Sequence, residues 1–328
     1  MTRLLLISLE HPEAQFYLKC LRHLPEVELA GLAEPDSRRL PANRELLNAV
    51  PIFEDYREML QKVSADGAIV CSANAKHKEM VIDCARAGLP VLCEKPLATR
   101  TADAREMLAI CQAHEVLLGL CSPIRFSDAL IQAKRLIEQG KLGKILAVNA
   151  RNRGTMPGDW FVDPELSGGG AIMAHAADVI GALRWISEAE FTSVFARASS
   201  VLHNLDVEDA GLLTLEMSNE AIVTLDTSWS RPKKSSPVGA DISLTIMGAR
   251  GVLNLELFPW TLNYYSEQAG KHLVISHDGD LIRQLLENFV RSLSGEATIA
   301  GSGVDGLRVL EVVEAAYRSV SSGAVVEL

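Results

Sequence analysis

Lys95 has the sequence neighbours expected of a catalytic group. It follows Glu94 in CEKPL, residues 93–97, at the end of a short apolar run. A lysine partly buried at a strand end can have its pKa lowered and can then exchange a proton with a substrate hydroxyl. Pro96 can fix a turn, including one with a cis peptide bond, that directs the lysine. The stretch therefore predicts a proton-transfer group.

His175 and Asp178 form a second candidate pair. They stand three residues apart in SGGGAIMAHAADVIGALRW, residues 167–185, so a helix there places both side chains on one face. Ala171 and Ala174 flank them and leave room for a ligand. The same small residues also permit close helix packing, which in isolation is the simpler interpretation.

A third candidate is the turn Ser8-Leu9-Glu10-His11-Pro12-Glu13, between a predicted strand and a predicted helix. A dinucleotide site normally has G-x-G-x-x-G there, so that the backbone can approach the pyrophosphate. If Glu10 faced the pyrophosphate at about 5 Å, repulsion of roughly 3 kcal/mol would weaken binding by about two orders of magnitude. If Glu10 points to solvent, the N–H groups at the helix start still favour an anion, although Pro12 removes one donor.

Two further turns offer contacts to a dinucleotide. Glu34 ends the second apolar run, where an acid can accept hydrogen bonds from the ribose hydroxyls and favours NAD over NADP. Arg38 and Arg39 follow and could instead accommodate a 2′-phosphate. In VCSANAKHKE, residues 70–79, Asn74 fits a helix N-cap. The same turn also offers N–H groups to a phosphate or to the nicotinamide ribose.

The elements that position these residues follow from the apolar pattern. Up to residue 121, short apolar runs alternate with helical patterns near 12–23, 37–49, 76–87 and 101–114. From 190 to 275 strand-like runs are adjacent, with helical patterns near 127–139, 171–186, 278–294 and 303–321. We therefore predict an α/β protein with two domains. A Rossmann-like doubly wound parallel sheet spans 1–122, and an α+β domain with a large, mainly antiparallel open sheet spans 123–328.

Composition limits the partners. The net charge of −10 over 328 residues argues against nucleic acid and against an anionic membrane. No apolar run approaches the roughly 18 residues of a membrane span. The six cysteines show no C-x-x-C pair, which predicts buried thiols in a reducing cytoplasm. The eight histidines form no H-x-H or H-E-x-x-H group, so no metal site is expected.

Several of these stretches together resemble the glucose-fructose oxidoreductase / inositol dehydrogenase / MocA family. They are VCSANAKHKE, VLCEKPLATRTADAREML, RFSDALIQAKRLIEQGKLGKI, GTMPGDWFVDPELSGGGAIM, ALRW, LDVEDAGLLTLEM and VLEVVEAAYRSVSSGAVVEL. Members of that family pair a Rossmann domain with an α+β domain whose open sheet commonly packs against another subunit. They use NAD or NADP to oxidise or reduce hydroxyls of sugars, cyclitols and related compounds. The resemblance implies NAD, with NADP as second candidate, a polyol or sugar-like substrate, and a homodimer or tetramer.

The resemblance also implies roles for particular residues. Lys95 matches the E-K-P lysine that contacts nicotinamide and substrate, Glu34 the ribose acid, and Arg125 the arginine that starts the linking helix. Asn74 and His77 match an N-x-x-H turn. The expected cofactor-binding residues are Ser8, Leu9, Glu10, His11, Glu34, Ser72, Asn74, His77, Glu94, Lys95 and Arg125.

The chain departs from the family pattern in three places. Ser8, Glu10 and Glu13 align with the three glycines of the fingerprint, and Ala73 stands where proline is usual. The helix after GGG usually carries an aspartate and, four residues later, an acid/base histidine. Those positions are Ala174 and Asp178 here, while His175 matches an additional histidine of some branches.

Three hypotheses follow. The first is an NAD-dependent dehydrogenase in which Lys95 is the main proton-transfer group, assisted by His175 or Asp178. The second is a non-catalytic relative that binds a sugar-like ligand or a partner protein. The third is a lyase or isomerase that uses transient oxidation with a retained cofactor. In each, the Gly/Pro-rich stretch 154–166 is either a lid or an ordinary surface loop.

Overall fold

The computed structural model describes residues 1–42, 47, 49–232, 241–257, 261–266, 271–276 and 280–328. It divides into two compact units, Met1–Pro123 with Asp280–Leu307, and Ile124–Gly279 with Arg308–Leu328. The sequence-based division instead leaves 280–307 in the second domain. Helix α8 (Leu281–Leu293) explains the difference, because its Phe289 and Leu293 pack against Gly67 in the sheet of the first unit.

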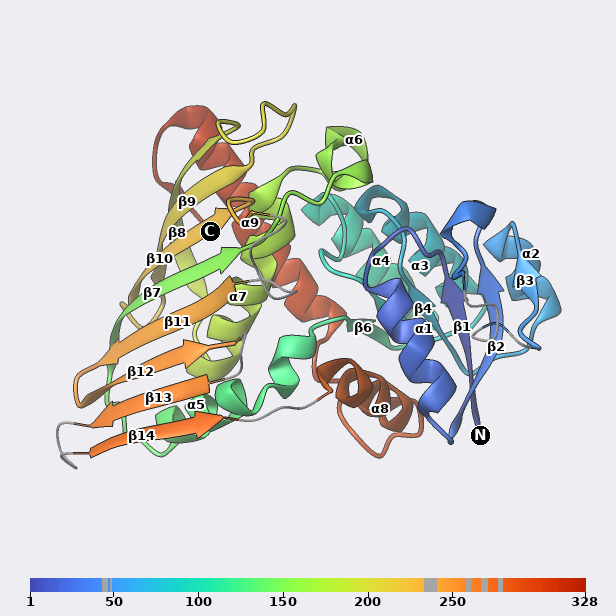
Figure 1. The fold of residues 1–328 in the computed structure, drawn as a ribbon, viewed down its shortest axis with the longest axis horizontal. Helices are drawn as coiled ribbons and strands as arrows, with labels where there is room; N and C mark the ends of the chain where they lie inside the picture. The colour runs from blue at the N-terminus through green and yellow to red at the C-terminus, as the bar shows by residue number, and fades with distance from the viewer. Residues whose placement is uncertain (43–46, 48, 233–240, 258–260, 267–270, 277–279) are drawn as a thin grey trace. The chain divides into compact units, whose positions relative to one another are not determined.

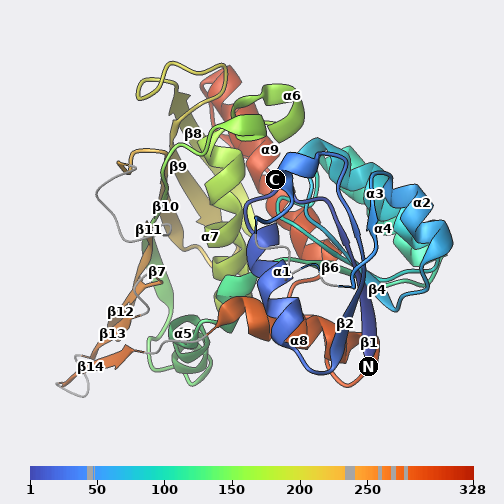
Figure 2. The same ribbon diagram turned by 45° about the vertical axis from the view of Figure 1, so that its right-hand side comes forward.

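The first unit contains a six-stranded parallel sheet of order β3-β2-β1-β4-β5-β6. Its strands are β1 (Thr2–Ile7), β2 (Val27–Ala33), β3 (Ile52–Phe53), β4 (Gly67–Val70), β5 (Val91–Cys93) and β6 (Leu118–Leu120). Its other helices are α1 (Ala14–His23), α2 (Tyr56–Lys62), α3 (His77–Arg86) and α4 (Thr101–Ala113). Figure 2 shows α1 on one face of this sheet and α3 and α4 on the other, so the predicted doubly wound sheet is confirmed.

Strand order and helix patterning explain where this unit offers a site. The buried residues of α1 are Ala14, Tyr17, Leu18 and Leu21, an apolar stripe at helical spacing that covers the sheet. The chain leaves β1 toward β2 on one side and returns to β4 on the other side. In such sheets ligands bind outside the carboxyl ends of the strands where the order reverses, here between β1 and β4 (Figure 1).

One predicted helix is wrong in its described part. Over 37–42 the structure has a 3-10 turn, η1 (Ser37–Arg39), followed by Leu40 in extended conformation. Pro41 comes next, and a proline disfavours helical geometry at the residue before it. Residues 43–46 and 48 lie outside the described residues. The crossover helix of this region is α2, which the sequence analysis did not identify.

The second unit contains a mixed, mainly antiparallel sheet of order β14-β13-β12-β11-β7-β10-β9-β8-β15 in the described residues, in which β7 and β10 are parallel neighbours. Its strands are β7 (Ile145–Arg153), β8 (Phe191–Ser199), β9 (Ala210–Met217), β10 (Ile222–Ser228), β11 (Asp241–Gly248), β12 (Gly251–Glu256), β13 (Thr261–Ser266), β14 (Lys271–Ser276) and β15 (Val326–Glu327). The predicted open sheet is confirmed.

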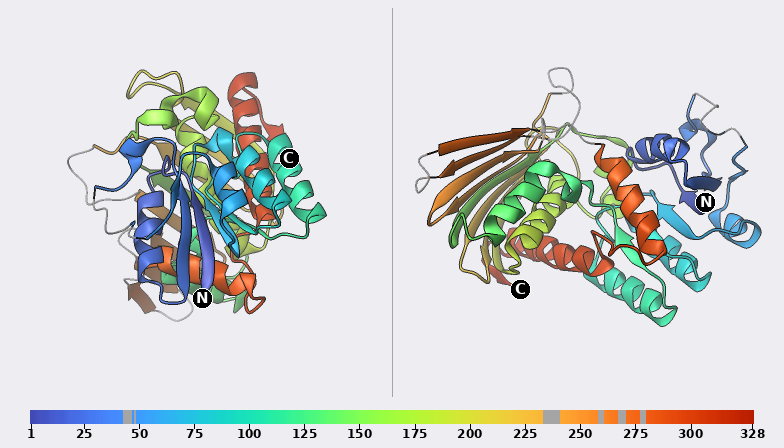
Figure 3. Two further views of the ribbon diagram at one scale, coloured as in Figure 1. Left: turned by 90° about the vertical axis from the view of Figure 1, so that its right-hand side faces the viewer. Right: turned by 90° about the horizontal axis from the view of Figure 1, so that it is seen from below.

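Helices cover one face of this sheet (Figure 1; Figure 3, right). Helix α7 (Ala171–Ser187) packs on β7, β9 and β10, and α5 (Asp128–Glu138) packs on β12, β13 and β14. Helix α9 (Gly303–Ser322) has Val309 against Gly181 of α7. The segment Pro164–Ser187 is apolar and long enough to cross a membrane, but 67% of its most apolar stretch is buried inside the protein. Its burial is that of a core helix.

Candidate active site

The turn between β1 and α1 satisfies its own backbone donors. Each N–H from Ser8 to Ala14 is hydrogen-bonded within the chain, apart from Pro12, which has none. The acceptors in order are Ala33 O, Glu34 Oε2, Ser8 Oγ, Cys71 O, His11 Nδ1 and His11 O, at 2.5–3.3 Å. Ser8 stands where the fingerprint has its first glycine and has φ of +69°. The turn thus keeps a backbone conformation typical of glycine, and side-chain acceptors bond several of its N–H groups.

Glu34 is one of those acceptors. Its side chain is buried, and its carboxylate accepts hydrogen bonds from Leu9 N at 2.5 Å and Asp36 N at 2.8 Å. The predicted ribose acid therefore joins the ends of β1 and β2. Its role toward a ribose remains a prediction.

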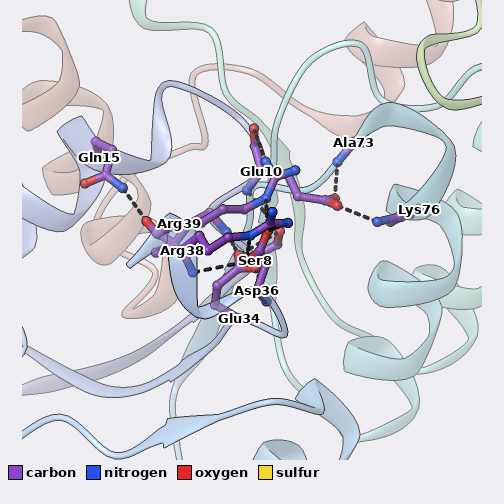
Figure 4. Close-up of polar contacts among 10 residues, drawn as sticks. Ser8, Glu10, Gln15, Glu34, Asp36, Arg38, Arg39, Ala73 and Lys76 are labelled. Carbon is purple, nitrogen blue, oxygen red and sulfur yellow. Dashed lines mark hydrogen bonds and ion pairs between the residues drawn. The ribbon is translucent and has the colours of Figure 1, made fainter. Parts of the chain in front are cut away.

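Glu10 spans the gap to the next turn of the same edge (Figure 4). Its carboxylate accepts a hydrogen bond from Ala73 N at 2.9 Å and forms an ion pair with Lys76 Nζ at 2.5 Å. Burial acts to raise the pKa of Glu10, but Lys76, the Ala73 amide and, more weakly, Arg39 together hold it below its ordinary value. The side chain of Glu10 is only 13% exposed. Glu10 therefore neither points to solvent nor stands as an uncompensated charge.

The two arginines after β2 are engaged nearby. Arg38 donates two side-chain hydrogen bonds to Asp36, at 2.8 and 2.7 Å, and Arg39 lies 3.8 Å from the same carboxylate. The hydrogen bonds from Arg38 lower the pKa of Asp36 to about 2. Arg39 also donates to Glu10 O at 3.4 Å. The basic charge of this segment is thus partly neutralised by Asp36.

A cavity of 240 Å³ lies at the same edge, on the β2 and β3 side. Its lining includes Ser8, Glu10, Pro35, Tyr56, Lys76 and Met80. The volume is below the roughly 300–1,000 Å³ of sites for drug-sized ligands. The cavity therefore has room for a nucleoside-sized fragment, and the Glu10–Lys76 pair forms part of its wall.

The turn after β4 differs from its prediction in one respect. Asn74 is not a helix N-cap: it begins a 3-10 turn, η3 (Asn74–Lys76), and α3 starts only at His77. The inserted turn moves the helix start past Asn74. His77 is buried, with Nδ1 at 2.9 Å from Pro96 O and Nε2 at 3.1 Å from Ser72 O. Burial lowers the pKa of His77. His77 therefore braces this turn against the turn after β5.

Lys95 lies in that turn after β5. It is half-buried, and the peptide bond between Lys95 and Pro96 is cis. Glu94 is fully buried and accepts hydrogen bonds from Lys95 N at 3.0 Å and from Tyr17 Oη at 2.5 Å. His11 Nδ1 lies 3.9 Å from the same carboxylate. Burial raises the pKa of Glu94. Glu94 thereby fixes the backbone from which the Lys95 side chain extends.

His175 and Asp178 lie in the second unit, on α7. With Ala174 they are partly exposed on a helix that is otherwise buried over its first three turns. Asn152 of β7 is fully buried and donates from Nδ2 to His175 O at 2.8 Å and to Asp178 Oδ2 at 3.2 Å. Gly154, at the end of the same strand, leaves room for the imidazole, because a Cβ there would lie 2.8 Å from His175 Nε2. The predicted pair does share one face.

The glycines before α7 make room for protein, not for a ligand. A Cβ on Gly169 would lie 1.9 Å from Tyr317 Oη, and one on Gly170 would lie 1.9 Å from Glu208 O. The Glu208 carboxylate accepts hydrogen bonds from Gly170 N at 3.0 Å, Ile172 N at 2.9 Å and Tyr317 Oη at 2.7 Å. Burial raises the pKa of Glu208. This carboxylate caps the helix that carries His175 and Asp178.

Two other predicted features also lie in the second unit. Arg125 is buried in a 3-10 turn, η4 (Pro123–Phe126), with its guanidinium 5.9 Å from the Trp185 ring. In the stretch 154–166, Trp160 is buried and stacks on Phe161. Met156 and Val162 pack on a cluster that includes Trp229. The stretch is anchored along its length, and a lid role for it remains a prediction.

The structure thus brings together the predicted residues of the first unit and, separately, those of α7. At the first edge are Ser8, Leu9, Glu10, His11, Glu34, Ser72, Asn74, His77, Glu94 and Lys95. The sequence analysis did not identify Lys76, Tyr17, Asn152 or Glu208. Lys76 stood in the quoted VCSANAKHKE turn, whereas nothing local in the sequence marks the other three.

Two family models match most of the chain. The model of the oxidoreductase family with NAD-binding Rossmann fold, GFO/IDH/MocA, matches residues 12–121. The model of the GFO/IDH/MocA C-terminal domain matches residues 130–254.

Individual relatives agree along the whole length. The chain is 24% identical to myo-inositol 2-dehydrogenase of Thermotoga maritima, over 94% of this chain and 93% of that one. It is 26% identical to D-glucoside 3-dehydrogenase of Escherichia coli, over 96% and 93%. Its fold is similar to the aldose-aldose oxidoreductase of Caulobacter crescentus, with a TM-score of 0.87 at 22% identity over 100% and 99% of the two chains. The WlbA dehydrogenase of Bordetella pertussis, solved with NADH and UDP-GlcNAcA, gives 0.86 at 22% identity over 100% and 98%.

Proposed function

Because the chain belongs to the Gfo/Idh/MocA family of oxidoreductases, we propose that it is an NAD(P)-dependent dehydrogenase of a sugar, cyclitol or related polyol. The observation that carries the proposal is the edge of the parallel sheet between β1 and β4. There, a nucleoside-sized cavity and a positioned lysine lie on the strand ends where such sheets bind ligands. The relatives named for inositol and for glucosides support this substrate class.

The residues present fit the adenosine part of the cofactor. The cavity offers the apolar side chains of Ala33, Pro35 and Met80 beside Ser8 and Lys76. Asp36 holds Arg38, which leaves less positive charge for a 2′-phosphate and supports NAD as the cofactor, with NADP second. The fit at the pyrophosphate is less direct, because the backbone donors of the β1–α1 turn are already bonded.

When bound, the nicotinamide supplies the hydride acceptor or donor. The chain's own side chains supply the proton transfer. Lys95 exchanges a proton with the substrate hydroxyl, from a backbone that Glu94 and Tyr17 fix. On α7, Asp178 is the second proton-transfer candidate, since Asn152 orients its carboxylate, and His175 is the third.

Replacing Lys95 tests the proposal. Lys95→Ala should lower kcat by about 10²–10⁴-fold, the range for loss of a general acid or base. The assay follows NADH formation with myo-inositol, methyl glucosides and aldoses as substrates. Lys78→Ala is the matched control, because the Lys78 ammonium is held by Asp103 and Glu106. Equal turnover of Lys95→Ala and wild type would remove Lys95 from the mechanism.

A non-catalytic relative that binds a sugar-like ligand or a partner is the second candidate. The observation that favours it is the self-bonded β1–α1 turn. A calorimetric titration with NADH and NADPH separates the two candidates, because the dehydrogenase must bind one of them. Absence of binding by the wild type would leave the non-catalytic candidate.

We also propose a homodimer or tetramer formed through the open face of the second sheet. Leu146, Leu212 and Ile222 are exposed there by 50%, 63% and 51% on β7, β9 and β10. Apolar exposure of this kind on neighbouring strands is suited to subunit contact. Leu212→Glu should shift the mass measured by light scattering toward the monomer, and an unchanged mass would contradict this interface.

A further inference from the structure

Glu10 occupies a set of donors that suits an anion. One donor is the ammonium of Lys76, and the other is the backbone N–H of Ala73. Both belong to the turn after β4, directly across from the β1–α1 turn that carries Glu10 (Figure 4). An ammonium beside a backbone N–H at the switch point of a doubly wound sheet is a combination that binds phosphate groups.

The backbone of Glu10 and its carboxylate are held by different groups. The Glu10 backbone is held by Ser8 Oγ on its N–H and by Arg39 on its carbonyl oxygen, at 3.1 and 3.4 Å. Its carboxylate contacts Lys76, whose side chain is 41% exposed. A pair with one long, exposed lysine contributes little to stability, so the carboxylate can separate from it at small cost.

The pair also forms part of the wall of the cavity. Glu10 and Lys76 both line the cavity on the β2 and β3 side. That cavity has the size of a nucleoside, so a dinucleotide placed in it must continue past the Glu10–Lys76 contact. A ligand without phosphate can enter the cavity without parting them.

We propose that Glu10 is a resident anion of the cofactor site, and that a dinucleotide binds by exchange, displacing the Glu10 carboxylate from Lys76. The inference rests on the proposed function, because it names how that site takes its cofactor. Glu10 then determines the affinity for the cofactor. Lys76 is the cation that pairs with Glu10 in the free protein and with a phosphate of the dinucleotide in the complex.

The exchange predicts that substitutions of Glu10 and of Lys76 change the affinity for NADH in opposite directions. Glu10→Gln keeps an acceptor for Ala73 N–H but removes the charge, so it should tighten NADH binding by about tenfold, or roughly 1.4 kcal/mol. Lys76→Met removes the cation that the phosphates need, so it should weaken NADH binding by about tenfold, again roughly 1.4 kcal/mol. A purely structural pair would make both variants weaker, because either change would loosen the same contact.

The experiment is calorimetric titration of NADH, ADP and adenosine into the wild type and both variants, with thermal unfolding to confirm that each is folded. Glu28→Gln is the matched control, because Glu28 forms an ion pair with Arg3 near the start of β2, at the opposite end of the sheet from the cavity. We expect opposite shifts for NADH and ADP in the two variants, a change below about threefold in the control, and unchanged adenosine affinity throughout.

The outcomes separate the inference from the function it rests on. If the wild type binds NADH and Glu10→Gln does not bind it more tightly, or Lys76→Met does not weaken it, the exchange is wrong while the dehydrogenase proposal stands. If neither the wild type nor Glu10→Gln binds NADH or NADPH, the proposed function falls, and the exchange with it.

Discussion

Two glutamates of this chain bind the donors at a turn before a helix, and they differ in what holds them. Glu208, in the second unit, receives hydrogen bonds from two backbone N–H groups of the α7 start and from Tyr317 Oη. Glu10, in the first unit, receives one backbone hydrogen bond and one ion pair from a half-exposed lysine. The first carboxylate is enclosed by two backbone donors and a buried tyrosine, whereas the second shares one backbone donor with a flexible lysine.

The comparison shows what glycine content can and cannot indicate. Three glycines precede α7, and the room beside two of them, Gly169 and Gly170, is taken by Tyr317 and Glu208. The turn before α1 has no glycine, yet Ser8 holds a positive φ there and side chains meet the donors. A glycine therefore indicates that another group lies close to the backbone. Only the surrounding structure shows whether that group belongs to the protein or to a ligand.

The largest expected effect is at Gly170. Gly170→Ala places a methyl group 1.9 Å from a backbone oxygen of residue 208, which cannot move like a side-chain end. Steric overpacking of this kind costs about 1–3 kcal/mol or more, and we expect the upper end. Denaturant unfolding measures the loss. A variant as stable as wild type would show that the glycines are not there for close packing.

Matched substitutions should separate the two carboxylates. Glu208→Gln turns an amide toward the Gly170 and Ile172 donors and should cost about 2 kcal/mol of unfolding free energy. Glu10→Gln should cost less than about 1 kcal/mol, because a partly exposed pair contributes little. Denaturant unfolding of both variants near pH 4.5, where both contributions are present, checks this order. Equal losses would contradict the distinction between an enclosed and an exchangeable carboxylate.

The same two variants should differ in the pH dependence of stability. The folded pKa of Glu10 is lowered, so its contribution is present above the ordinary value of 4.5 and is lost as the pH falls through the folded pKa. The folded pKa of Glu208 is raised, so its contribution is present below 4.5 and is lost as the pH rises through the folded pKa. In unfolding experiments, the stability difference from wild type should therefore shrink for Glu10→Gln as the pH falls below 4.5, and for Glu208→Gln as the pH rises above 4.5. Parallel pH profiles would contradict the account.

The smallest expected effect is at Ser8. Ser8→Ala keeps the unfavourable φ and removes an acceptor from Glu10 N–H, so it should cost about 1 kcal/mol. Ser8→Gly removes the same acceptor but relieves the left-handed backbone, worth about 1–2 kcal/mol, so its net effect should be near zero or stabilising. Thermal unfolding compares the two. A glycine variant less stable than the alanine variant would contradict the backbone argument.

The sequence predicted the fold because the evidence for it is local. Apolar periodicity located α1, α3, α4, α5 and α7 to within a few residues, and alternation predicted the parallel sheet. The 37–49 pattern failed where Pro41 follows Leu40, since a proline overrides periodicity. Lys95 was also marked locally, by Pro96 after it, which allowed the cis bond that the structure has.

The partners of the site residues were not predictable, because they are distant in the chain. Lys76 is 66 residues from Glu10, and Tyr317 is 109 residues from Glu208. The sequence showed a charge at Glu10 and allowed two fates for it, repulsion of a phosphate or exposure to solvent. The structure shows a third, neutralisation by a lysine of the neighbouring turn, which pattern and spacing do not encode.

A crystal structure of the protein grown with excess NADH tests the central claim most directly. The account predicts the cofactor at the carboxyl ends of β1 and β4, with Lys76 on its phosphates and the Glu10 carboxylate turned away from that ammonium. Bound cofactor beside an intact contact between Glu10 and Lys76 would contradict the exchange. A crystal with that edge of the sheet unoccupied would contradict the site itself.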